Sequence, residues 1–177
     1  KVLATGAPRR DVSLSASELQ AYLDTLPRLL TEHYVITLSG TASEEVSVNG
    51  FYGCGSLLLR ANNLGDCVFK RELRVLNCRL PVQMEKLKWE LDETANKYRY
   101  CLPCQKSMVY ADGCSFNGHA QNGRGVGVFY NSSAVLASCA FHDLESVVTT
   151  SWGGRVEIYG TNPATDYSNN YVGARHI

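Results

Sequence analysis

The chain has 177 residues, 45% of them hydrophobic, and its 17 lysines and arginines balance its 17 aspartates and glutamates. This length is enough for one well-buried domain. The zero net charge argues against a nucleic-acid-binding surface, which usually carries a basic excess. No apolar run reaches the length of about 18 residues expected of a membrane-spanning helix.

The N-terminal part predicts a linker followed by a helix. Residues 1–14 show no hydrophobic period and are interpreted as a leader or linker. Ser15 and Glu18 then fit a capping box, in which the serine and glutamate side chains satisfy backbone groups at the start of a helix. One apolar helix face follows at Leu19, Tyr22, Leu23 and Leu26. Because Pro27 disfavours helical geometry at the residue before it, we expect a helix within residues 15–30, covering one end of the fold.

Short strands separated by glycine-rich corners are predicted next. The expected strands are Tyr34–Leu38, Glu45–Val48, Ser56–Arg60, Cys67–Phe69 and Leu73–Cys78. The segment 86–105 interrupts this rhythm, because it is dense in charge and carries Trp89, Tyr98 and Tyr100. We interpret it as a loop inserted into the regular structure.

A repeat between residues 123 and 160 carries the prediction of the fold. Val126–Val135 and Val147–Val156 each read as a β-branched run, a turn of small residues and a second alternating run, 21 positions apart. A second pattern, cysteine followed two places later by an apolar residue, recurs at Cys78, Cys114 and Cys139. Repeats of this length without a helical period are typical of a β-solenoid, in which equivalent residues stack into interior ladders. An antiparallel sandwich is the alternative.

Three phrases in residues 17–58 resemble the opening of right-handed parallel β-helix proteins of the pectate-lyase-like superfamily. They are the helical phrase Ser17–Pro27, the strand Tyr34–Thr41 ending in Gly-Thr, and Val46–Leu58 with its Gly-Phe-Tyr-Gly. The closest likeness is to β-helix modules of phage and prophage tail fibres or appendages. The resemblance implies an all-β, single-stranded right-handed parallel β-helix over residues 15–177, with coils from residue 34 and an N-terminal capping α-helix. It leaves the activity open, because this fold carries many functions.

The seven cysteines are interpreted mainly as small buried hydrophobic residues. Cys101 and Cys104 form a CxxC pair, but no helix is expected after them, as a redox dithiol would require. Together with Cys114 and His119 they form a weak zinc candidate. A structural pair, either a disulfide or adjacent thiols, is the simpler interpretation, and no cofactor is predicted.

Catalytic candidates would be carboxylates that share a groove, as polysaccharide cleavage requires. The acids best placed in the sequence are Asp112, Asp143 and Glu145, but the repeat alignment stacks no two of them. An acid pair stacked on one exposed face would favour an enzyme. Without one, a catalytic role is poorly supported.

Exposed aromatic residues are the better candidates for binding. Tyr130 and Trp152 fall one position apart in the repeat alignment, on neighbouring turns near a shared corner, and Tyr159 follows. Sugar rings dock against flat aromatic faces, so these three residues are predicted to contact carbohydrate.

Three function classes follow from these observations. The first is a non-enzymatic building block of a phage or prophage tail, made in the bacterial cytoplasm, that contacts host-surface glycans. The resemblance implies this class, and it implies a homotrimer. The alternatives are a β-helix polysaccharide lyase or glycoside hydrolase, and a bacterial surface adhesion module.

Overall fold

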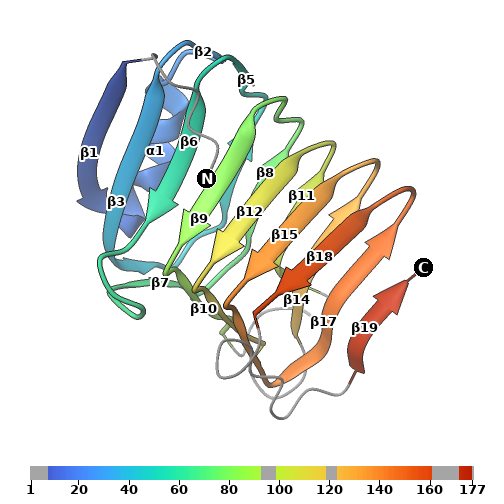
Figure 1. The fold of residues 1–177 in the computed structure, drawn as a ribbon. Coiled ribbons are helices and arrows are strands. Elements are labelled where there is room, and N and C mark those ends of the chain that lie inside the picture. The colour runs from blue at the N-terminus through green and yellow to red at the C-terminus, as the bar shows by residue number, and fades with distance from the viewer. Residues whose placement is uncertain (1–7, 93–98, 119–122, 161–171, 177) are drawn as a thin grey trace.

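The chain folds into a parallel β-solenoid, seen in a computed structural model that describes residues 8–92, 99–118, 123–160 and 172–176 (Figure 1). Every pair of neighbouring strands in these residues is parallel, and successive coils stack along one axis. On the first face, register partners on neighbouring coils are 22–27 residues apart. The predicted all-β solenoid is therefore confirmed, and the antiparallel sandwich is wrong.

The coils have three faces. Face 1 consists of β3 (His33–Ala42), β6 (Ser56–Arg60), β9 (Pro81–Glu85), β12 (Met108–Asp112), β15 (Ser133–Ala137) and β18 (Arg155–Tyr159). Face 2 consists of the end of β3, β7 (Cys67–Phe69), β10 (Lys88–Glu90), β13 (Ser115–Asn117) and β16 (Ala140–His142). Face 3 consists of β4 (Val46–Asn49), β8 (Leu73–Leu76), β11 (Tyr100–Gln105), β14 (Gly123–Phe129), β17 (Leu144–Ser151) and β19 (Val172–His176). β5 (Tyr52–Gly53), in the corner between β4 and β6, pairs with β2 (Leu29–Leu30), which precedes β3.

A helix covers the N-terminal end, as predicted, and the capping box forms. Ser15 accepts a hydrogen bond from the backbone of Ser17, and the Glu18 carboxylate accepts one from the Ser15 amide. A 3₁₀ turn (Ala16–Glu18) leads into α1 (Leu19–Thr25), which lies behind β1 and β3 at the blue end of Figure 1. The helix ends at Thr25, because Leu26, which precedes Pro27, is extended.

The interpretation of residues 1–14 as a linker is wrong for the part that the structure describes. Arg9–Ser15 forms β1, which adds a parallel edge strand to β3. Charges suit such an edge because they discourage further strand pairing. Arg9 pairs with Asp11 at 2.6 Å, and Arg10 pairs with Glu32 at 2.9 Å.

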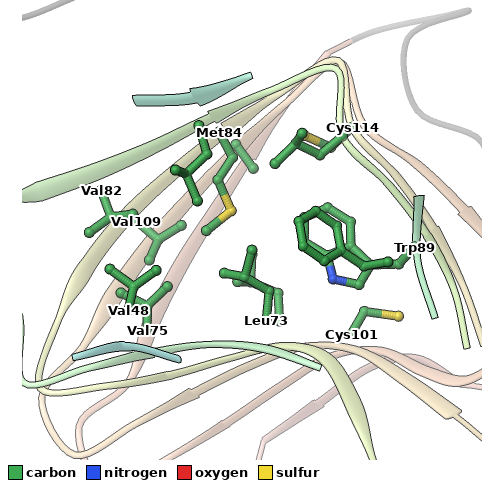
Figure 2. Close-up of a cluster of buried hydrophobic side chains, with 14 of the residues drawn as sticks. Val48, Leu73, Val75, Val82, Met84, Trp89, Cys101, Val109 and Cys114 are labelled. Atoms are coloured by element: carbon green, nitrogen blue, oxygen red, sulfur yellow. The ribbon is translucent and has the colours of Figure 1, made fainter. Parts of the chain in front are cut away.

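The core is built from side chains that repeat from coil to coil. Figure 2 shows Val82, Met84 and Val109 of face 1, Val48, Leu73 and Val75 of face 3, and Trp89 of face 2 pointing into one interior. On face 2 the aromatic rings of Phe69, Trp89, Phe116 and Phe141 stack in turn, with centroids 5.4, 4.7 and 5.2 Å apart. This aromatic ladder ties four consecutive coils together.

The expected insertion at residues 86–105 is wrong where the structure describes it. Lys88–Glu90 forms β10 and Tyr100–Gln105 forms β11, so most of the segment belongs to the coil. Trp89 is buried in the aromatic ladder. Residues 93–98, which include Tyr98, lie outside the described residues.

The cysteine ladder exists, with one member exchanged. The 25-residue step is confirmed, because Phe116 pairs in register with Phe141 and brings Cys114 beside Cys139. In the same column Leu87 precedes Cys114, and Cys67, two residues before Phe69, precedes Leu87; Cys78 is not part of it. Cys78 lies at another corner, where its amide donates to the Ser107 hydroxyl at 3.0 Å.

The later repeat is 22 residues long, not 21. Ala134 pairs with Val156 on face 1, and Val126 pairs with Val148 on face 3. A slip of one residue exchanges the inward and outward side chains of a strand. The 21-residue alignment therefore matches Val135, which points outward, with Val156, which is the register partner of the inward-pointing Ala134.

Candidate functional site

The candidate site lies at the corner where face 3 passes into face 1, called here the 3–1 corner. Leu76, Gln105, Phe129 and Ser151 are in register at the ends of their strands. The residues that follow them therefore form a column of equivalent positions, and all four have left-handed backbone geometry: Asn77 (φ 54°), Lys106 (47°), Tyr130 (55°) and Trp152 (49°).

Tyr130 and Trp152 stack on one another in this column. Their ring centroids are 4.5 Å apart and the ring planes differ by 10°. Trp152 is 65% exposed and Tyr130 is 40% exposed. The structure thus brings together two of the three residues predicted to contact carbohydrate, and the corrected 22-residue step makes them direct equivalents.

Two further aromatic rings support this stack from face 3. The Phe129 ring lies 6.4 Å from Trp152, and Tyr100 packs edge-on against Phe129 at 5.3 Å. Both rings lie over Gly127, where an added Cβ would come within 2.6 Å of Phe129 and 2.8 Å of Tyr100. Gly127 therefore lets the rings lie against the sheet.

An ion pair fixes the outer edge of the supporting rings. Arg124 donates to the Glu145 carboxylate at 2.9 and 3.2 Å, and to the Tyr100 hydroxyl at 3.2 Å. Its guanidinium also lies 5.6 Å from the centre of the Tyr100 ring. The hydrogen bonds to Glu145 raise the pKa of Arg124 despite its partial burial. Tyr100 is therefore held in a single orientation.

The backbone at the stack is strained, because both Tyr130 and Trp152 have left-handed geometry. Left-handed geometry is uncommon for residues other than glycine and asparagine, and holding a bulky side chain in it costs about 1–3 kcal/mol. Gly50 and Asn77 serve equivalent corners with residues that tolerate this geometry. Tyr130 and Trp152 thus place bulky, exposed side chains at left-handed positions, in a column that also contains Asn77 and Lys106.

Tyr159, the third predicted contact residue, does not join the stack. It lies at the far end of β18, about 13 Å of strand from Arg155 at the 3–1 corner. Its ring is 55% exposed and its hydroxyl donates to Glu157.

The three catalytic candidates are not brought together. Asp112 ends β12 on face 1, whereas Asp143 lies between β16 and β17 with left-handed geometry. Glu145 faces outward on β17 and is paired with Arg124. No shared groove contains these three acids.

The structure reveals an acid pair that the sequence reading missed. Asp112 is the register partner of Glu85, so the two carboxylates stack on neighbouring strands of face 1, about 4.8 Å apart at the backbone. Their inward neighbours Met84 and Ala111 are buried, so both acids point outward. In the sequence, the pair is visible only with a 27-residue step between β9 and β12. Treating residues 86–105 as an insertion hides this step.

The zinc candidate gains no support from the geometry of the described residues. Among them, no three histidine, cysteine, aspartate or glutamate side chains gather as metal ligands would. Cys101 and Cys104 lie along β11, Cys114 lies at the corner before β13, and His119 is outside the described residues.

Most of the thiols are buried in the hydrophobic core. All seven are free, and only Cys54 is exposed. Burial raises the pKa of Cys67 to about 12 and that of Cys101 well above its usual range. A nucleophilic thiolate needs a lowered pKa, so the CxxC pair does not resemble a redox dithiol.

Comparisons with protein-family models, curated proteins and solved structures gave no match. Within the described residues, neither the length nor the hydropathy of any helix reaches what a membrane-spanning segment needs.

Proposed function

We propose that this protein is a non-enzymatic, carbohydrate-binding β-solenoid module whose contact platform is the Tyr130–Trp152 stack. The observation that carries the proposal is the exposure of two stacked aromatic rings at strained corner positions. Aromatic faces provide a large, rigid contact area with little loss of side-chain entropy, and a sugar ring packs against them through its apolar face.

The packing of the Tyr130–Trp152 stack suits a rigid binding site. Tyr130 covers one face of the Trp152 indole, and Trp152 as a whole is 65% exposed, so part of the indole remains accessible to a ligand. Phe129 and Tyr100 lie beneath, so the platform does not have to be ordered when the ligand binds. Such preorganisation improves affinity because less conformational entropy is lost on binding.

Replacing Trp152 with asparagine is expected to weaken glycan binding at least about 30-fold, the effect of losing a hot-spot aromatic residue. The fold should persist, because Asn77 already occupies an equivalent left-handed corner. Isothermal titration with a glycan identified by array screening measures the change, and thermal melting checks the fold.

The matched control is Tyr159→Asn, which removes an exposed aromatic residue away from the stack. It should leave affinity unchanged. Equal loss in both variants, or unchanged binding in Trp152→Asn, would place the site elsewhere.

The biological setting that we propose is a phage or prophage tail fibre or appendage that assembles as a homotrimer. The support for this setting is the resemblance of residues 17–58 to tail β-helix modules, together with the solenoid architecture that the resemblance implies. Light scattering of the native protein tests the trimer.

A polysaccharide-cleaving enzyme is the second candidate, favoured by the stacked acids Glu85 and Asp112. Retaining glycosidases hold their two carboxyl groups about 5–5.5 Å apart, a separation that neighbouring parallel strands can provide. In this mechanism one carboxylate attacks the sugar and the other protonates the leaving oxygen.

A further inference from the structure

Two buried thiols lie side by side at the corner where face 1 passes into face 2. Ser115 and Ala140, the residues that follow Cys114 and Cys139, pair in register, and the Ala140 amide donates to the Cys114 carbonyl at 2.9 Å. The Cα atoms of Cys114 and Cys139 are therefore about one strand spacing apart, about 4.8 Å. This separation falls within the range of roughly 4.4–6.8 Å that a disulfide requires.

The two side chains also share one orientation. Each Sγ donates to the carbonyl oxygen two residues earlier, from Cys114 to Asp112 at 3.5 Å and from Cys139 to Ala137 at 3.3 Å. A hydrogen bond from Cys114 lowers the pKa of the Cys139 thiol, whereas burial raises the pKa of Cys114 well above its usual range. Because the thiolate is the nucleophilic form, Cys139 is the thiol of the pair that attacks first.

Other cysteines that the sequence places near one another are too far apart to be joined. Cys101 and Cys104 are three residues apart on one strand, which separates their Cα atoms by about 10 Å. Cys67 lies in the same column as Cys114, but Leu87 stands between them, so they are about two strand spacings apart. Cα atoms more than about 7 Å apart cannot be bridged unless the backbone moves.

We propose that Cys114 and Cys139 form an oxidative modification site, at which a small disulfide such as glutathione disulfide converts the two thiols into a disulfide between neighbouring coils. Neither residue belongs to the proposed binding site at the 3–1 corner. The structure holds both as free thiols. A chain that folds in a reducing compartment would therefore acquire the bond only when it meets an oxidant.

The reaction is a thiol–disulfide exchange in two steps. The Cys139 thiolate attacks one sulfur of the small disulfide, which releases one small thiol and leaves a mixed disulfide on Cys139. The Cys114 thiolate then attacks the Cys139 sulfur and releases the second small thiol. The two protein thiols lose two protons and two electrons in total, and the small disulfide gains them to become two thiols.

The oxidant reaches the pair when the corner opens. Both thiols are buried, but Ser138, directly before Cys139, is exposed, and Gly113, directly before Cys114, is partly exposed. Opening this one corner exposes the sulfurs without unfolding the other coils. We therefore expect the pair to react more slowly than Cys54, the exposed thiol.

The test incubates the full reduced chain with glutathione disulfide under native conditions, blocks the remaining thiols with N-ethylmaleimide and then digests the denatured protein with trypsin. Cleavage after Lys106, Arg124 and Arg155 puts the two cysteines on separate peptides, 107–124 and 125–155, which only a disulfide keeps together. Mass spectrometry should find these two peptides linked. The cross-link restricts the unfolded chain, so the Tm of the oxidised protein should be about 5–15 °C higher than that of the reduced protein. Dithiothreitol should reverse both changes.

Cys139→Ala should remove the linked peptides and the gain in Tm together. The matched control is Cys67→Ala, which removes a buried thiol of the same column that is not adjacent to the pair, and it should keep both. Absence of the linked peptides after native oxidation would overturn the proposal. Linked peptides that form only in unfolded protein, or that leave the Tm unchanged, would also overturn it.

Discussion

Replacing Trp89 with alanine is expected to lower the free energy of unfolding by about 3–5 kcal/mol, the cost of deleting a large buried aromatic side chain. Trp89 is fully buried at the centre of the aromatic ladder, 5.4 Å from Phe69 and 4.7 Å from Phe116. Its loss would open a cavity between coils that backbone pairing prevents from collapsing. Urea unfolding followed by circular dichroism measures the change.

Trp89→Phe separates the loss of stacking from the loss of the indole. Within the described residues, the Trp89 Nε1 is buried without a hydrogen-bond partner, and phenylalanine removes this unsatisfied donor while keeping a ring in the ladder. The phenylalanine variant should lose clearly less stability than the alanine variant, because it leaves a smaller cavity. If Trp89→Ala unfolded at the wild-type urea concentration, the ladder would not be a core element.

Replacing Cys139 with aspartate is expected to prevent folding. Cys139 is fully buried beside Cys114, and its Sγ donates to the Ala137 carbonyl at 3.3 Å. An aspartate there would bury a carboxylate without a cation, which costs far more than the domain's marginal stability can absorb. Expression as insoluble protein, or loss of the native circular dichroism spectrum, is the expected result.

Cys139→Ala is the control, since it removes the sulfur without adding charge. It should fold with a loss of about 1 kcal/mol. A soluble Cys139→Asp protein that melts like the wild type would show that Cys139 does not point into the core.

The solenoid was predictable because stacked coils repeat their inward residues. The 25-residue step from Cys114 and Phe116 to Cys139 and Phe141 equals the length of one coil. The capping box at Ser15 and Glu18 was equally readable, because it depends on local spacing alone.

The misreading of residues 86–105 has a physical cause. Leu87, Trp89 and Leu91 alternate with charged residues, which is the period of a half-buried strand. The outward charges neutralise one another, as Glu90 pairs with Lys70 at 2.7 Å and with Lys88. The high density of charge in this segment belongs to the solvated face of β10 and does not indicate a loop.

The candidate site was half predictable. The repeat placed Tyr130 near Trp152, but the coil lengths differ, so only the structure gives their direct stacking and the pairing of Glu85 with Asp112. The left-handed backbone at Tyr130 and Trp152 could not be predicted, because corners of this kind normally favour glycine or asparagine.

The most direct test of the account is to screen the wild-type protein on a glycan array and to follow the size of the bound polysaccharide over time. Binding that leaves the polymer length unchanged is the predicted result. Shortening of the polymer would contradict the non-enzymatic assignment and make Glu85 and Asp112 the catalytic pair to examine. Absence of binding to every glycan would contradict the carbohydrate-binding role of the Tyr130–Trp152 stack.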